Sequence, residues 1–126
     1  MRRTLLIVFV LVAACSSSAT AVVDQVGAAE AGELAAGSAV VLDIRTPEEF
    51  IDGHVEGALN IDFYAADFAD RIGNLDRDVV YLVYCRSGNR SGQAMQLFED
   101  LGFAEVHELQ GGILAWVQEG LPLVGG

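Results

Sequence analysis

Residues 79–91 read Val79-Val80-Tyr81-Leu82-Val83-Tyr84-Cys85-Arg86-Ser87-Gly88-Asn89-Arg90-Ser91. The unbroken apolar and aromatic run at the start of this segment is typical of a central parallel strand that is covered on both faces. The pattern predicts that the strand ends before Cys85, that residues 85–90 form a loop, and that a helix begins at Ser91. Glycine tolerates positive φ, so Gly88 allows the loop to curl.

Short apolar runs alternate with helical patterns on both sides of this segment, which predicts an α/β fold with a parallel sheet. The expected strands cover residues 22–26, 39–44, 58–61, 79–84 and 105–109. The expected helices cover residues 28–36, 47–52, 64–72, 91–101 and 113–119. Thr46 suits the N-cap of the second helix, Pro47 suits its first turn, and Gly102 suits a left-handed stop after the fourth.

The predicted loop lies at the carboxyl end of the sheet, where open α/β folds carry their ligand sites. Its N–H groups, together with the helix N-terminus, would form a concavity that binds an anion. The same field and the charges of Arg86 and Arg90 should lower the pKa of the Cys85 thiol below about 8.5. Because the thiolate is the nucleophile, Cys85 is the candidate catalytic residue.

The charge of the chain is strongly acidic. Its 126 residues include 18 acidic and 7 basic side chains, for a net charge of −11, and none of the basic residues is lysine. Such a composition excludes nucleic acid as a partner, because phosphate contacts need basic patches. Two of the few arginines fall in the 85–90 loop, where they would draw in a small anion at short range.

The N-terminal residues predict export. Arg2 and Arg3 precede an apolar run over residues 5–14, which is shorter than the roughly 20 residues of a membrane-spanning helix. Small residues directly before Cys15 resemble the bacterial lipobox, which implies a diacylglyceryl group on Cys15 and cleavage before it. We therefore expect a signal peptide over residues 1–14, a tether over 15–21 and a domain over 22–124. An ordinary secretory signal with an incidental cysteine is the alternative.

This prediction places the domain outside the cytoplasm, anchored to the cell membrane by the lipid. After cleavage, five basic residues would face 18 acidic ones, a net charge of −13, so anionic lipid headgroups would repel the domain. The anchor must then be covalent, and two acyl chains suffice for stable anchoring. Cys85 would be a lone exported thiol, which indicates reactivity. A buried structural cysteine and a disulfide with Cys15 are the alternatives.

Three motifs in this order resemble the single-domain rhodaneses, the thiosulfate sulfurtransferase-like proteins, over residues 24–123. The motifs are Asp43-Ile44-Arg45-Thr46-Pro47-Glu48-Glu49-Phe50 followed by Gly53-His54-Val55-Glu56-Gly57-Ala58-Leu59-Asn60-Ile61, the loop from Cys85 to Ser91, and Gly111-Gly112-Ile113-Leu114-Ala115-Trp116. The resemblance implies a single domain with a central five-stranded parallel sheet flanked by helices. It also implies a sulfurtransferase that needs no cofactor.

In this family the cysteine takes a sulfane sulfur from a donor such as thiosulfate, forms a persulfide, and passes the sulfur to a cyanide or thiol acceptor. Carried over to this chain, the resemblance makes Cys85 catalytic. The substrate-binding residues would be Arg86, Ser87, Gly88, Asn89, Arg90 and Ser91. Phosphatases of the same fold resemble the arrangement but place five residues between cysteine and arginine. Here four residues separate Cys85 from Arg90, which favours a persulfide sulfur over a phosphate.

The remaining polar residues are expected to be structural. Asp43 and Arg45 would brace the loops near the site with Glu48 as a partner, and His54 would serve as a hydrogen-bonding group in its turn. His107 is expected to be exposed in a short terminal strand. No cluster has metal-ligand spacing, so no metal is expected. Two other functions stay open: a relay or anion-binding module that serves a membrane partner without efficient turnover, and an inert scaffold.

Overall fold

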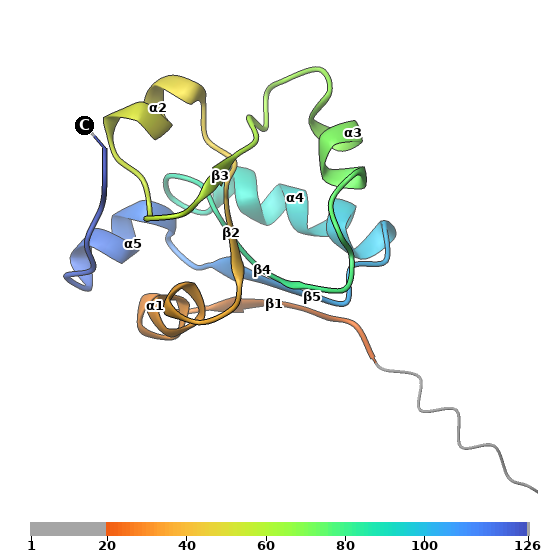
Figure 1. The fold of residues 1–126 in the computed structure, drawn as a ribbon, viewed down its shortest axis with the longest axis horizontal. Coiled ribbons are helices and arrows are strands. Elements are labelled where there is room, and N and C mark those ends of the chain that lie inside the picture. Colours follow the sequence, from red (N-terminus) through yellow and green to blue (C-terminus); the bar gives the residue numbers. More distant parts are fainter. Residues whose placement is uncertain (1–19, 126) are drawn as a thin grey trace, which may run out of the picture.

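The computed structural model describes residues 20–125 and forms one α/β domain. Its five strands are parallel and lie in the order β1-β5-β4-β2-β3. The strands are β1 (Val22–Val26), β2 (Val40–Asp43), β3 (Leu59–Asn60), β4 (Val80–Tyr84) and β5 (Glu105–Leu109). The helices are α1 (Ala28–Ala36), α2 (Pro47–Asp52), α3 (Phe68–Gly73), α4 (Asn89–Asp100) and α5 (Gly112–Gln118). The predicted fold class and sheet are therefore confirmed (Figure 1).

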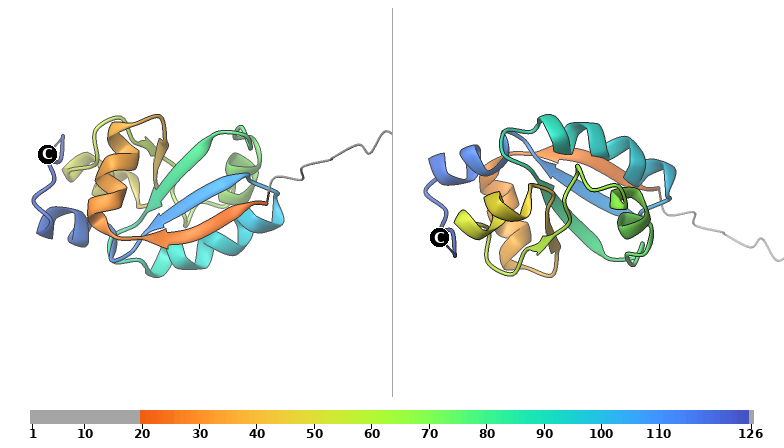
Figure 2. Two further views of the ribbon diagram at one scale, coloured as in Figure 1. Left: turned by 90° about the horizontal axis from the view of Figure 1, so that it is seen from below. Right: turned by 90° about the horizontal axis from the view of Figure 1, so that it is seen from above.

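The central strand β4 is buried on both faces. Val83 and the following Cys85 pack on the face covered by α3 and α4, whereas Leu82 and Tyr84 pack on the face covered by α1 and α5. Figure 2 shows α1 and α4 on opposite sides of the sheet. Each fully buried Val or Leu side chain contributes roughly 1.5–3 kcal/mol. Packing on both faces therefore fixes the position of β4, and with it the start of the loop that follows.

Most predicted boundaries agree with the structure, and two helices differ. Helix α4 begins at Asn89, two residues earlier than expected, because Gly88 in the left-handed conformation already ends the loop. Helix α3 begins at Phe68 instead of residue 64. The carboxylate of Asp62 accepts a hydrogen bond from the N–H of Tyr64 at 2.9 Å, and this turn competes with a helical start. The capping box of α2 forms between Thr46 and Glu49.

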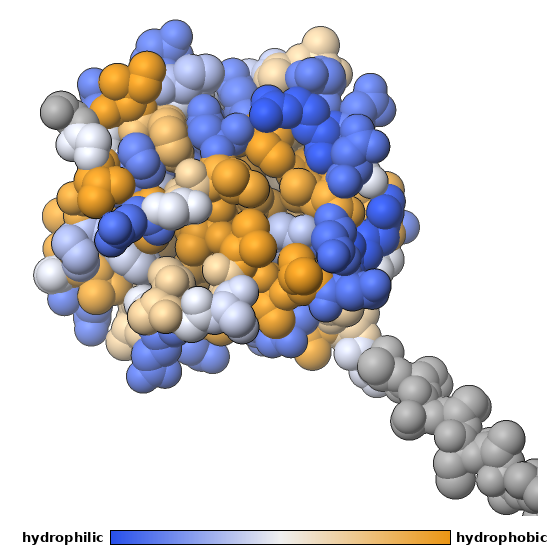
Figure 3. All heavy atoms as spheres, viewed as in Figure 1, coloured by the Kyte–Doolittle hydropathy of each residue, from blue (hydrophilic) through white to orange (hydrophobic). Residues whose placement is uncertain are grey.

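The C-terminal segment lies beside α2, where His54 and Val124 exchange two backbone hydrogen bonds. The surface mixes charged side chains with scattered apolar ones, and apolar side chains gather in the middle of the face drawn in Figure 3. Within residues 20–125, none of the helices has the length and apolar character needed to cross a bilayer. The predicted signal peptide, Cys15 and most of the predicted tether lie outside the described residues and stay predictions.

Candidate active site

Cys85 directly follows β4, and its sulfur lies under the N-terminus of α4. The side chain is only 1% exposed. Its Sγ accepts hydrogen bonds from the N–H of Gly88 at 3.1 Å and from the N–H of Ser91 at 3.4 Å. The Ser91 hydroxyl lies 3.3 Å from the same sulfur. The loop thus directs two main-chain donors at one sulfur atom, with a hydroxyl beside them, which is the arrangement that stabilises a sulfur anion.

The loop turns its amides inward because its carbonyls are bound on the other side. The carbonyl of Cys85 accepts from the N–H of Ile113 at 2.9 Å, and the carbonyl of Arg86 accepts from the N–H of Leu114 at 3.2 Å. These donors belong to the first turn of α5, whose free N–H groups need acceptors. Such an approach requires glycine at position 112, where a Cβ atom would lie 2.6 Å from the Cys85 oxygen. The turn at Gly111 and Gly112 before α5 therefore holds the loop in place.

Two opposing effects act on the Cys85 thiol. Burial raises its pKa, but hydrogen bonds from the Ser91 hydroxyl and from the N–H groups of Ser91, Gly88 and Ser87 outweigh the burial. The net result is a pKa below the ordinary value of a cysteine thiol. The thiolate fraction at neutral pH is accordingly raised, which is the condition for a nucleophilic sulfur.

Glu108 is a buried carboxylate beside the loop that the sequence reasoning missed. It is 0% exposed, and its Oε1 accepts a hydrogen bond from the Ser91 hydroxyl at 2.6 Å. Its Oε2 accepts from the side-chain amide of Gln25 at 2.8 Å. No pattern in the sequence indicates this burial, which follows from the pairing of β5 on both sides, with Glu108 opposite the buried Val83.

The two loop arginines have different surroundings. Arg90, in the first turn of α4, forms a two-pronged ion pair with Glu49 of α2 at 2.8 and 3.0 Å. This contact lowers the pKa of Glu49 to about 2, chiefly through the hydrogen bond from the guanidinium. Arg86 is exposed, and its guanidinium has no hydrogen-bonding partner among residues 20–125. Arg86 is therefore available to an incoming anion, whereas Arg90 is already shared with a carboxylate.

The other predicted loop residues lie around the sulfur as follows. Ser87 and Asn89 are exposed, and the side chain of Asn89 accepts from Gln93 at 3.2 Å. Gly88 has a φ of 103°, which confirms the expected positive φ at this position. Ser91 is fully buried between the sulfur and Glu108. Their assignment as substrate-binding residues stays a prediction.

Asp43 and Arg45 form the expected brace under the site, but with different partners. Their buried ion pair measures 2.7 Å, and the same Arg45 nitrogen donates to the carbonyl of Gly53 at 2.7 Å. The Tyr84 hydroxyl donates to Asp43 at 2.6 Å, which ties the brace to the end of β4. The predicted contact with Glu48 is wrong, because this side chain is exposed to solvent. Its neighbour Glu49 binds Arg90 of α4 instead, because the capping box with Thr46 turns Glu49 toward the start of α2.

The two histidines lie away from the sulfur. His54 is structural, as expected: its Nδ1 lies 2.8 Å from the carbonyl of Phe50, and its ring stacks on the Phe50 ring. The expected exposure of His107 is wrong, because the residue is 7% exposed. Burial lowers the pKa of His107, but hydrogen bonds to Glu105 and Asp24 outweigh it and raise the pKa. Residues 20–125 contain no cluster of three His, Cys, Asp or Glu side chains suited to a metal ion.

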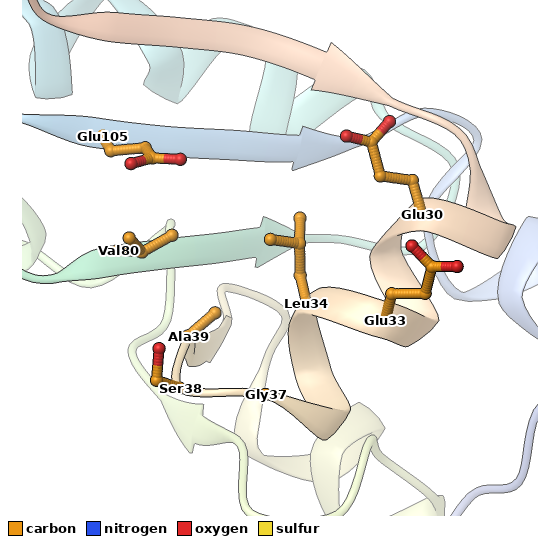
Figure 4. Close-up of a pocket in the computed structure, with 8 residues that line it drawn as sticks. All are labelled: Glu30, Glu33, Leu34, Gly37, Ser38, Ala39, Val80 and Glu105. Atoms are coloured by element: carbon orange, nitrogen blue, oxygen red, sulfur yellow. The ribbon is translucent and has the colours of Figure 1, made fainter.

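A pocket of about 340 Å³ lies at the opposite end of the sheet, where β4 and β5 begin (Figure 4). Three of its lining side chains are carboxylates, from Glu30, Glu33 and Glu105. This lining repels anions, and no residue of the Cys85 loop contributes to it. The pocket therefore does not serve the chemistry of the sulfur.

Comparison with known proteins agrees with the geometry of the loop. Residues 28–119 match the rhodanese-like domain family. A sulfurtransferase of Allochromatium vinosum is 41% identical over 85 residues, which cover 68% of this chain and 78% of that protein. Thiosulfate sulfurtransferase GlpE of Ectopseudomonas mendocina is 38% identical over 87 residues, covering 69% and 78%.

Solved structures show the same likeness. A rhodanese-related protein from Thermoplasma volcanium superposes with a TM-score of 0.72 at 35% identity, covering 80% of this chain and 97% of that chain. The rhodanese-like domain of an Anabaena protein superposes with a TM-score of 0.71 at 29% identity, covering 81% and 79%. A family match over most of the chain, sulfurtransferase relatives near 40% identity and a shared fold lead to one conclusion. This chain belongs to the rhodanese-like domain family.

Proposed function

We propose that this protein is a sulfurtransferase that carries a sulfane sulfur as a persulfide on Cys85. The observation that carries the proposal is the set of donors on Sγ, from Gly88 and Ser91, at the carboxyl end of β4. The sulfurtransferase names of the relatives support the same reaction class. Thiosulfate is the proposed test donor, and cyanide or a thiol is the proposed acceptor.

The reaction divides into two displacements at sulfur. The Cys85 thiolate attacks the outer sulfur of thiosulfate, a new S–S bond forms, and sulfite leaves with the electron pair of the broken S–S bond. The persulfide then carries its negative charge on the outer sulfur, within reach of the inward-facing N–H groups. Cyanide attacks this outer sulfur, thiocyanate leaves, and the Cys85 thiolate is restored. No other oxidant or reductant is needed.

Arg86 and Arg90 have different proposed roles in binding the anionic donor. Arg86 is exposed and unpaired within the described residues, so it is the proposed first contact for a dianionic donor. Arg90 holds α2 against α4 through Glu49 and adds positive potential near the sulfur. We therefore expect Arg86→Ala to raise the KM for thiosulfate while leaving the thiolate fraction of Cys85 nearly unchanged.

The experiment is the formation of thiocyanate from thiosulfate and cyanide by the purified protein. Wild-type protein should turn over, and Cys85→Ser should be inactive. Activity retained by Cys85→Ser would refute the role of this sulfur. If mass spectrometry shows one added sulfur on Cys85 but turnover is negligible, the protein is a sulfur relay that receives its cargo from a partner, the second function that the sequence leaves open.

We also propose that the domain works outside the cytoplasm, tethered to the membrane through a lipid on Cys15. The support is the N-terminal sequence pattern alone, with Cys15 placed between an apolar run and a serine stretch. Detergent phase partitioning tests it. The full chain should enter the detergent phase, and Cys15→Ser should stay in the aqueous phase; equal partitioning of both would refute the anchor.

A further inference from the structure

The hydroxyl of Ser91 lies between two acceptors that compete for its single proton. The Ser91 Oγ is 2.6 Å from Oε1 of Glu108 and 3.3 Å from Sγ of Cys85. These two contacts place the sulfur and the carboxylate within about 6 Å of each other, a range over which like charges disfavour one another. Neither the family match nor the sequence motifs single out Glu108.

No cation in the described part of the chain pairs with Glu108. Its partners are two neutral groups, the Ser91 hydroxyl on α4 and the Gln25 amide on β1. The charged side chains nearest the loop are held elsewhere or exposed: Arg90 is bound by Glu49, and Arg86 is exposed. A fully buried carboxylate without a cation is costly while it is ionised. Taking up a proton removes this cost.

The hydrogen-bonded series Cys85–Ser91–Glu108 has two arrangements that hold the same number of protons. In the first, Glu108 is ionised and accepts from the Ser91 hydroxyl, so the neutral Cys85 thiol can only donate to Ser91. In the second, Glu108 is protonated and donates to the Ser91 oxygen, so the Ser91 hydroxyl turns and donates to the Cys85 thiolate. The two arrangements differ by the movement of one proton along each of two hydrogen bonds.

We propose that Glu108 is the proton partner of Cys85: the proton that leaves the thiol passes through Ser91 and is held by Glu108 while the sulfur is an anion. Glu108 is in this sense a positioning residue, because it acts on the sulfur only through Ser91. The inference deepens the proposed sulfur transfer, and its catalytic meaning rests on that function.

The step balances without any further reactant. The S–H bond of Cys85 breaks and an O–H bond forms on Ser91, while the original Ser91 proton forms the O–H bond of Glu108. The sulfur keeps the electron pair and becomes the nucleophile. During both displacements the proton stays on Glu108, so the carboxyl group presents no negative charge to an anionic donor.

The first test is the pH profile of Cys85 alkylation by iodoacetamide in wild-type protein and in Glu108→Gln. Glutamine imitates the protonated acid, because its amide can donate to Ser91 while its carbonyl accepts from Gln25. Because Glu108 already holds the proton while the sulfur is an anion, the midpoint in Glu108→Gln should stay within about 0.3 pH units of the wild-type midpoint. A fall of about one pH unit or more would show that Glu108 is ionised beside the sulfur and would overturn the proposal. Glu99→Gln removes an exposed charge from α4 and should leave the midpoint in place.

A double-mutant cycle tests whether the effect passes through Ser91. In Ser91→Ala the hydroxyl is missing, so the thiol proton cannot reach Glu108, which then stays ionised near the sulfur. In this background the change from Glu108 to Gln should lower the midpoint by about one pH unit, in contrast to the wild-type background. A shift of equal size in both backgrounds would show that the charge of Glu108 acts directly, and the proton relay would be refuted.

An infrared difference spectrum tests the proposal without changing Glu108. At neutral pH, wild-type protein should show a protonated carboxyl band that Cys85→Ser lacks, because a serine hydroxyl stays neutral and leaves Glu108 ionised. A band that is equal in both proteins, or absent from both, would contradict the shared proton. None of these readouts needs sulfur transfer. Thiocyanate formation can therefore fail while the proton pairing holds, and the reverse is equally distinguishable.

Discussion

Replacing Glu49 by glutamine tests the ion pair that holds α4, the helix after the Cys85 loop, against α2. Glu49 lies on α2 and binds Arg90 on α4 through both carboxylate oxygens, at 2.8 and 3.0 Å. The side chains are only 12% exposed for Arg90 and 29% exposed for Glu49. This contact spans 41 residues of sequence and is the ion pair that connects α2 to the first turn of α4.

The pKa of Glu49 fixes the size and the pH range of the effect. A fall from the ordinary 4.5 to about 2 corresponds to at most about 3 kcal/mol of stabilisation, and solvent screening of this partly exposed pair lowers the expected value to about 1–2 kcal/mol. Because the pKa is lower in the folded state, the stabilisation is complete above pH 4.5. It disappears as the pH falls toward about 2, where the folded protein also takes up the proton.

The assay is urea unfolding of wild-type protein and Glu49→Gln at pH 7 and at a series of lower pH values. Glu49→Gln should be less stable by about 1–2 kcal/mol at pH 7, and the two curves should converge near pH 2. The matched control is Glu48→Gln, the exposed neighbour on the same helix, which should change stability by less than about 0.5 kcal/mol. An equal loss in both variants, or a difference that persists at pH 2, would refute the reasoning.

Four further outcomes follow from other contacts in the structure. Gly112→Ala should cost more than about 1 kcal/mol of stability and displace the loop, because its Cβ would lie 2.6 Å from the Cys85 oxygen at a φ of +62°. Gly92→Ala should instead stabilise the protein by about 0.5–1 kcal/mol, since its Cβ would meet no other atom within 4 Å and alanine loses less conformational entropy than glycine inside a helix; unfolding curves that rank these two variants the other way would contradict this account. Asp43→Asn should lower the free energy of unfolding by about 3–5 kcal/mol, because it leaves Arg45 buried without its charge partner; a loss below about 1 kcal/mol would show that the pair is not a brace. Alkylation of wild-type Cys85 should have its midpoint below about pH 8.5, and a higher midpoint would mean that burial outweighs the donors on the sulfur.

The fold could be predicted because its causes are local in sequence. A strand covered on both faces of a parallel sheet must be apolar throughout, so the apolar run over residues 80–84 predicts a central strand. The N-cap at Thr46, the positive φ at Gly88 in the loop and the helix stop at Gly102 are likewise properties of single positions. The late start of α3 was missed because the turn at Asp62 replaces a first helical turn that the apolar spacing alone would allow.

The site could be predicted only as far as its sulfur and its loop. The contact between Ser91 and Glu108 depends on the strand order, which places β5 beside β4, and no periodicity in the sequence carries this information. The same cause explains the error at His107, since β5 lies between β1 and β4 and not at the edge of the sheet. The choice between Glu48 and Glu49 depends on the direction in which α2 turns, which is fixed by its capping box.

The central claim is that the loop amides hold a sulfur anion on Cys85, and the mass of the intact protein tests it most directly. After incubation with thiosulfate and removal of the excess, wild-type protein should gain the mass of one sulfur atom on Cys85, and cyanide should remove it again. Cys85→Ser should gain nothing under the same conditions. A wild-type protein that stays at its original mass, or a gain that persists in Cys85→Ser, would contradict the account.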